Sequence, residues 1–177
     1  MRIAGLKLND CVDGDGITVS LWTQGCPHRC PGCHNPETWD FEGGEAVENN
    51  NLRGQIVKAL VANGINRNFS ILGGEPLCKE NAEDVLTILT CVKIALSNTK
   101  VFLWTGYTYE YLISLNDDCI NEILSKVDIL IDGPYVDSER DLTLYLRGSR
   151  NQRVINLQQM REENTKSLII IDKNEKI

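Results

Sequence analysis

The sequence is poor in histidine and phenylalanine, and it contains no long apolar run. Its 177 residues include two histidines and three phenylalanines, and they show no obvious pair of a general acid and a general base. No stretch is apolar over the roughly 18 residues that cross a membrane. The N-terminal MRIAGLKLNDC lacks the apolar core of a signal peptide. We therefore expect a cytoplasmic protein without a membrane partner.

Basic residues are also in short supply. Lysine and arginine number 18 against 25 aspartates and glutamates, which gives a formal net charge of -7. Proteins that bind nucleic acid usually present a basic face to the phosphates, so this balance argues against a nucleic-acid partner. The hydrophobic content of 42% is ordinary for a soluble globular protein, and the length suits one domain with its own core.

Short apolar segments alternate with amphipathic ones along the chain. The expected strands are 17–24, 68–72, 101–105 and 127–132; the expected helices are 48–64 and 81–96, with one or two short helices within 109–125. Strands that are apolar on both faces and separated by helices are typical of a parallel sheet with right-handed crossovers. The sequence therefore predicts an α/β fold with a mostly parallel sheet, in which Asn81 caps the second long helix.

Three unusual sequences follow three of these strands. GCPHRCPGCHNPETW (25–39) follows the first strand, GGEP (73–76) the second and TGY (105–107) the third. The carboxyl ends of parallel strands meet at one edge of a sheet, where ligand sites collect. We therefore expect the three sequences to converge on one functional site.

The first of these sequences holds Cys26, Cys30 and Cys33 within eight positions, with no fourth cysteine nearby. Clustered cysteines in a cytosolic chain indicate metal or redox chemistry before disulfides. Structural zinc needs four ligands, and His34 directly follows Cys33, although adjacent residues seldom reach one tetrahedral ion together. Three thiolates suit a 4Fe–4S cluster better, because one iron then stays open for a substrate. Zinc and three unliganded thiols remain as alternatives.

The CxxxCxxC spacing combined with GGEP is similar to that of the radical S-adenosylmethionine enzymes. The set QGCPHRCPGCHNPETWDFEGG, ILGGEPL, WTGY, LIDGPY and RGSRNQRVI, spread over residues 13–155, more closely resembles the anaerobic ribonucleoside-triphosphate reductase-activating proteins. This resemblance implies a single-domain, partial (open) βα barrel of the radical S-adenosylmethionine type over residues 1–159. Residues 160–177 would then form a C-terminal tail, either an edge strand or a flexible extension.

The resemblance also implies an activity. Cys26, Cys30 and Cys33 would hold one 4Fe–4S cluster, whose open iron binds S-adenosylmethionine. A flavodoxin- or ferredoxin-like donor would supply the electron that cleaves this cofactor to a 5′-deoxyadenosyl radical. The radical would take a hydrogen from a glycine of the large reductase subunit, with no catalytic side chain beyond the cluster and cofactor. The alternatives are an activase of another glycyl-radical enzyme, a radical enzyme acting on a small molecule, and a non-catalytic zinc module.

Cofactor contacts follow from the same resemblance. It implies backbone contacts to the adenine from Gly32, Cys33 and His34. The methionine end would meet the turn of Gly73, Gly74, Glu75 and Pro76. Thr105 would make a contact on the ribose side. Gly73 and Gly74 would let the backbone approach the ligand where a side chain would collide. We expect His28 to be an exposed loop histidine without a role.

Arginines gather in an irregular segment, 130–155, which ends in an expected strand at 153–157. Long irregular segments in compact domains are usually functional or disordered. We therefore expect Arg147 and Arg150 to provide charged contacts for the reductase. The alternative is that they neutralise acidic residues of the same segment, namely Asp132, Asp137 and Glu139.

Overall fold

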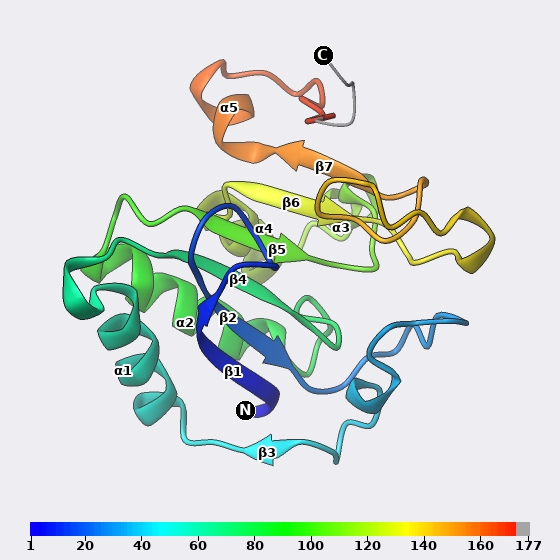
Figure 1. Ribbon diagram of the computed structural model, residues 1–177. Coiled ribbons are helices and arrows are strands. Elements are labelled where there is room, and N and C mark those ends of the chain that lie inside the picture. The colour runs from blue at the N-terminus through cyan, green and yellow to red at the C-terminus, as the bar shows by residue number, and fades with distance from the viewer. Residues whose placement is uncertain (173–177) are drawn as a thin grey trace.

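The computed structural model describes residues 1–172 and shows an α/β fold built on one seven-stranded sheet (Figure 1). The strands are β1 (Arg2–Asp10), β2 (Thr18–Thr23), β3 (Glu45–Ala46), β4 (Asn68–Gly73), β5 (Val101–Trp104), β6 (Ile129–Asp132) and β7 (Arg153–Asn156). Their order across the sheet is β3-β1-β2-β4-β5-β6-β7, so the sheet is open, with β3 and β7 at its edges.

The four central strands, β2, β4, β5 and β6, run parallel, as the sequence predicts. β1 pairs antiparallel with β2, and β7 pairs antiparallel with β6. The parallel register places Thr23 of β2 opposite Gly73 of β4, at the carboxyl ends of both strands. The loops that follow these strands therefore begin side by side.

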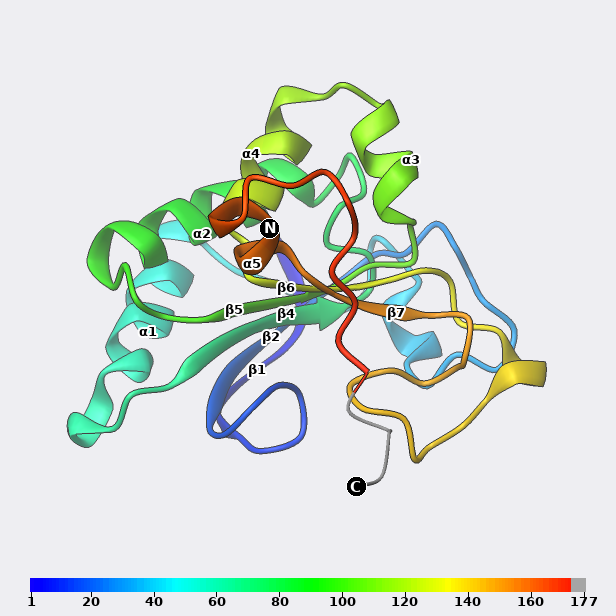
Figure 2. The same ribbon diagram turned by 90° about the horizontal axis from the view of Figure 1, so that it is seen from above.

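The helices are α1 (Asn49–Leu60), α2 (Ala82–Ala95), α3 (Tyr109–Ser114), α4 (Asp118–Lys126) and α5 (Leu157–Glu162), with short 3-10 helices at Pro36–Thr38, Ala62–Gly64 and Asp137–Glu139. Figure 2 shows the α-helices gathered on one side of the sheet. Among the described residues, no helix has both the length and the apolar character needed to cross a membrane.

The main core lies between the sheet and these helices. Val101 and Leu103 of β5 pack into it, whereas Phe102 between them joins a smaller apolar cluster with Ile131 on the opposite face. Successive side chains of a strand point to opposite faces, so both faces of β5 are buried. Each fully buried side chain of this size stabilises the fold by about 1.5–3 kcal/mol.

Asn81 precedes α2 but does not cap it through its side chain. Its Nδ2 instead donates to the carbonyl oxygens of Gln24, at 3.0 Å, and Glu75, at 2.9 Å. The predicted N-cap position of Asn81 is therefore confirmed, but its side-chain amide ties the start of α2 to the loops after β2 and β4 instead of making a capping hydrogen bond.

The last described residues lie along β7. Asn156 N donates to Ile169 O at 2.8 Å, and Ile171 N donates to Val154 O at 2.8 Å. α5 separates β7 from this segment. Residues 173–177 of the expected tail lie outside the described residues, and the domain boundary at residue 160 stays a prediction.

Candidate functional site

The cysteine loop, the GGEP turn and the TGY turn meet around one cleft of about 130 Å³. Its lining includes Cys26, Cys30, Cys33, Gly73, Gly74, Glu75, Thr105 and Gly106. These residues follow the carboxyl ends of β2, β4 and β5, which the parallel register brings together. The predicted convergence of the three sequences is confirmed.

The three clustered cysteines are free thiols with different exposure. Cys26 is buried, and Cys30 and Cys33 are partly exposed. Burial raises the pKa of the Cys26 and Cys30 thiols above the ordinary value, so the thiolate is costly there until a cation offsets its charge. Within residues 1–172, no three cysteine, histidine, aspartate or glutamate side chains are arranged to hold a single metal ion.

The cysteine loop is closed by the segment that follows it. Gly25 N donates to Thr38 O at 2.8 Å, and Cys26 N donates to Trp39 O at 3.2 Å. A Cβ at Gly25, which has a φ of +92°, would lie 2.2 Å from the ring of Phe41. The glycine before the first cysteine is therefore required by both its backbone conformation and its packing.

The GGEP turn packs directly on this loop. Gly74 N donates to Thr23 O and Glu75 N donates to Gly25 O, both at 2.8 Å. A Cβ at Gly74 would lie 2.3 Å from Gly25 O, and one at Gly73 would lie 2.8 Å from Thr23 N. The contact of these glycines with a ligand stays a prediction; the structure shows that Gly73 packs closely on the end of β2 and Gly74 on the start of the cysteine loop.

Glu75 is fully buried and joins three loops. Its Oε1 accepts hydrogen bonds from Leu77 N and Thr105 Oγ1, both at 2.9 Å. Its Oε2 accepts one from Gly106 N at 2.7 Å and lies 2.9 Å from His28 Nε2. Protein groups thus surround both oxygens of this carboxylate, which links the cysteine loop to the GGEP and TGY turns.

His28 is part of this junction, so the expectation that it is exposed and without a role is wrong. Its side chain is 18% exposed and contacts Glu75. Its ring also packs edge-on against Tyr107, with 4.4 Å between the ring centroids. The contact partner lies 47 positions away in the sequence, which is why the local pattern around His28 gave no signal of it.

Not every candidate cofactor contact lines the cleft. Cys33, Gly73, Gly74, Glu75 and Thr105 do, whereas Gly32, His34 and Pro76 are absent from its lining. The exposed ring of His34 packs edge-on against Tyr135 instead. The lining also includes Trp39, Tyr135 and Gln152, none of which was a candidate. Tyr135 and Gln152 fall within LIDGPY and RGSRNQRVI, so those two motifs held the missing signal.

Comparison with known proteins agrees with this geometry. A family model described as a 4Fe-4S single cluster domain matches residues 12–155. A Vibrio cholerae protein named anaerobic ribonucleoside-triphosphate reductase-activating protein is 34% identical over 81% of this chain and 90% of its own length. Proteins of the same name from Escherichia coli K12 and Enterobacteria phage T4 are 32% and 34% identical over 84% and 82% of this chain, and over 94% and 87% of their own lengths.

This chain belongs to the family of anaerobic ribonucleoside-triphosphate reductase-activating proteins. The 4Fe–4S domain match contains every cysteine of the chain except Cys11. Of the cysteines within the match, three line the cleft. The residues present fit an iron–sulfur cluster, since three thiols face one cleft beside a turn that packs on their loop.

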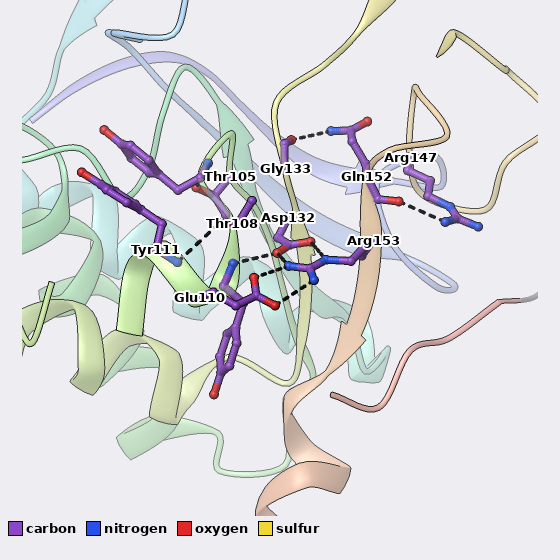
Figure 3. A network of polar contacts seen from close by, with 11 residues as sticks. Thr105, Thr108, Glu110, Tyr111, Asp132, Gly133, Arg147, Gln152 and Arg153 are labelled. Atoms are coloured by element: carbon purple, nitrogen blue, oxygen red, sulfur yellow. Dashed lines mark hydrogen bonds and ion pairs between the residues drawn. The ribbon is translucent and has the colours of Figure 1, made fainter. Parts of the chain in front are cut away.

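A second polar network lies beside the cleft, between β6, α3 and β7 (Figure 3). Arg153 donates to both oxygens of Glu110, at 2.9 and 2.7 Å, and its Nε donates to Asp132 Oδ1 at 2.9 Å. Tyr109 N, at the start of α3, donates to Asp132 Oδ2 at 2.7 Å. The hydrogen bonds from Arg153 lower the pKa of Glu110 to about 2.

The two candidate docking arginines differ in exposure. The Arg147 side chain is 9% exposed, donates to Gln152 O at 3.0 Å and pairs with Asp172 at 3.1 Å. Arg150 is 71% exposed and pairs with Asp141 at 3.1 Å. These partners are not the acidic residues named as the alternative, and only Arg150 presents its charge to solvent.

Proposed function

We propose that this protein activates anaerobic ribonucleoside-triphosphate reductase by generating a glycyl radical in its large subunit. The single observation that carries the proposal is the cleft in which three cysteine thiols meet the GGEP turn. Cys26, Cys30 and Cys33 hold a 4Fe–4S cluster, and S-adenosylmethionine binds at its open iron. Together these groups supply a 5′-deoxyadenosyl radical that abstracts hydrogen from the glycine.

The chain's own residues bind and position these groups. The three thiols would lose their protons on binding iron. The positive charge of the iron would then offset the cost of burying the Cys26 and Cys30 thiolates. Glu75 fixes the GGEP turn against the cysteine loop through its contacts with Thr105, Gly106 and His28. The backbone of Gly73, Gly74 and Glu75, which line the cleft, would then contact the methionine end of the cofactor.

The shape of the site favours a protein substrate over a small molecule. The cleft measures about 130 Å³, whereas pockets that enclose a small ligand usually measure about 300–1,000 Å³. A cleft of this size does not enclose a small molecule by itself, so we infer that a partner protein closes the site around the cofactor. The open sheet with helices on one side agrees with a partial barrel of the radical S-adenosylmethionine type, whose rim the reductase covers.

Two partners follow from this proposal. The large reductase subunit presents its glycine at the rim, with Arg150 as an exposed charged contact. A flavodoxin- or ferredoxin-like protein supplies the electron. Arg150→Ala should weaken the complex with the reductase and lower the yield of glycyl radical, while cleavage of S-adenosylmethionine without the reductase stays near wild type. Unchanged affinity in a binding titration contradicts the contact.

The proposed activity is tested by reconstituting the protein with iron and sulfide under anaerobic conditions. The protein is then reduced and mixed with S-adenosylmethionine and the purified reductase. We expect methionine and 5′-deoxyadenosine as products, and a glycyl-radical signal in electron paramagnetic resonance that requires all components. Cofactor cleavage without a glycyl radical would indicate another target, and a protein that binds zinc but no iron–sulfur cluster would contradict the proposal.

A further inference from the structure

The segment that follows β6 packs on the cysteine loop. Residues 133–139 leave the sheet at the carboxyl end of β6 and include Tyr135, which lines the cleft together with the three cysteines. The ring of Tyr135 lies edge-on against His34, the residue after Cys33, with 5.8 Å between the ring centroids. A segment that is distant in the sequence is therefore in contact with the part of the cysteine loop that carries Cys33.

The same segment makes a second contact at Gly32, between Cys30 and Cys33. A Cβ at Gly32, which has a φ of +75°, would lie 2.6 Å from Oδ1 of Asp137. This oxygen accepts a hydrogen bond from the hydroxyl of Tyr135 at 2.9 Å, so the carboxylate is oriented by a residue of its own segment. Glycine at position 32 thus suits both the backbone conformation of the loop and the close approach of Asp137.

The 133–139 segment is held in turn by the residues before β7. Gln152 Nε2 donates to Gly133 O at 3.1 Å, as Figure 3 shows. Asn151 Nδ2 donates to Pro134 O at 2.7 Å. A residue that positions a site must itself be fixed by its surroundings, and these two hydrogen bonds fix the backbone directly before Tyr135.

Tyr135 also contacts Cys30 through its backbone. Burial raises the pKa of the Cys30 thiol, and a hydrogen bond from the backbone of Tyr135 acts against this rise. A backbone N–H has this effect because it donates to the sulfur and favours the thiolate. The corresponding backbone donors to Cys26 are His28 and Arg29, within the cysteine loop itself. Cys30 therefore receives a hydrogen bond from a separate part of the fold.

We propose that Tyr135 is a positioning residue for the iron–sulfur cluster, in which its backbone N–H donates to the Cys30 sulfur that binds iron and its hydroxyl holds Asp137 over Gly32. This inference rests on the proposed function, because it requires Cys30 to be a cluster ligand. Hydrogen bonds to the ligand sulfurs orient them and are among the factors that set the reduction potential of a cluster. The 133–139 segment thus fixes the Cys30–Cys33 half of the loop.

Isotopic labelling of the backbone nitrogen of tyrosine tests the hydrogen bond to Cys30. The labelled wild-type protein is reconstituted and reduced, and electron–nuclear double resonance is recorded on the cluster signal. We expect a hyperfine coupling from a tyrosine nitrogen. It should disappear in Tyr135→Phe, which keeps the N–H but places it in an unlabelled residue, and it should return when phenylalanine carries the label in that variant. The matched control is Tyr107→Phe, which removes the tyrosine beside His28 and should keep the coupling.

Two results of this experiment would overturn the inference. The first is a reduced wild-type cluster without any coupling to a tyrosine nitrogen, a result that needs no variant to fold. The second is a coupling that persists in Tyr135→Phe with labelled tyrosine, because another tyrosine is then the donor. In both cases the assembled cluster leaves the proposed function standing, whereas a wild-type chain that assembles no cluster contradicts both.

Asp137→Ala tests the contact over Gly32 in the reconstituted protein. The variant removes the carboxylate and with it the acceptor of the Tyr135 hydroxyl. Hydrogen exchange of a peptide that covers residues 30–35, followed by mass spectrometry, should become about fivefold faster, as expected for the net loss of one hydrogen bond. Glu139→Ala, an exposed acidic residue of the same segment, is the control and should exchange like the wild type. An unchanged rate in Asp137→Ala, or an equal increase in Glu139→Ala, would overturn this contact.

Discussion

Two fully buried carboxylates stand near the carboxyl ends of parallel strands and are satisfied in different ways. Glu75 follows β4 and contacts two backbone N–H groups, a hydroxyl and the imidazole of His28. Asp132 ends β6 and is held by the guanidinium of Arg153 and the N–H of Tyr109. Both side chains are 0% exposed.

This difference separates a carboxylate that joins the loops of the cleft from one that is paired within the network beside it. The charge of Asp132 is offset by an arginine within the chain, as a buried charge requires for stability. No lysine or arginine of residues 1–172 pairs with Glu75, which instead connects the loops that carry the cysteines, GGEP and TGY. Glu75 thus serves as a junction between the loops of the cleft, whereas the network around Asp132 joins β6, α3 and β7.

The largest effect is expected from the three cysteines that line the cleft beside Glu75. Replacing Cys26, Cys30 or Cys33 singly by Ala should abolish the 4Fe–4S cluster and all cleavage of S-adenosylmethionine, because two thiolates cannot hold the cluster. Iron and sulfide analysis, visible absorption and product assay measure this loss. Cys91→Ala, in α2 away from the cleft, is the control, and an equal loss there would refute the assignment of three ligands.

Removal of the Glu75 carboxylate is expected to have the next largest effect. Glu75→Ala leaves the N–H groups of Leu77 and Gly106 and the hydroxyl of Thr105 without an acceptor, at about 1–3 kcal/mol each before relaxation. We expect a lower free energy of unfolding, measured with denaturant, and less iron retained after reconstitution. Glu75→Gln, which keeps one acceptor oxygen, should recover part of both. The exposed Glu42→Gln is the control, and Glu75→Ala behaving like this control would show that the junction has no structural role.

The support network should give a defect of stability without loss of the metal centre. Arg153→Ala leaves Asp132 buried without its partner, which should cost about 3 kcal/mol in the free energy of unfolding. Arg150→Ala removes an exposed partner of Asp141 and should cost less than about 1 kcal/mol. Chemical denaturation measures the free energy of unfolding of both variants. Equal losses in the two variants would contradict the special role of the buried Asp132. Loss of iron from folded Arg153→Ala would show that the two parts of the rim are not separate.

The smallest effect is expected from Glu110 and depends on pH. Arg153 lowers the pKa of Glu110 from 4.5 to about 2 in the folded protein. The unfolded chain therefore takes up this proton at a higher pH, so the stabilisation is complete above about pH 4.5 and is lost as the pH falls through about 2. Unfolding titrations between these values should show a shallower acid dependence for Glu110→Gln than for wild type. Glu122→Gln, whose partner Lys126 is one turn away on α4, is the control; an equal change in both variants would remove the assignment to Glu110.

The sequence predicts the central sheet and the convergence of its motifs because both depend on local patterns. The four parallel strands are short apolar runs, and a parallel order then brings their following loops to one edge. β1 was not predicted, since several of its residues are exposed and its sequence RIAGLKLND mixes polar and apolar residues. It is a strand because it pairs with β2 on one side and with β3 on the other.

The contacts that organise the site could not be predicted, because they join residues that lie far apart in the chain. Position 74 requires a glycine because a Cβ there would collide with Gly25 O, and His28 contacts Glu75. The nearly buried side chain of Arg147 pairs with Asp172, which lies 25 positions later in the sequence. In each case the role of the residue depends on a contact with a neighbour that is distant in the sequence, and the residue type alone does not predict that contact.

The most informative single measurement asks whether S-adenosylmethionine binds the 4Fe–4S cluster that we propose is held by Cys26, Cys30 and Cys33. The reconstituted, reduced protein is mixed with S-adenosylmethionine that is isotopically labelled in its amine and carboxylate, and electron–nuclear double resonance is recorded on the cluster signal. We expect hyperfine coupling of both labelled groups to the cluster, because three thiolates leave one iron open. Saturating binding of the cofactor without either coupling would contradict it.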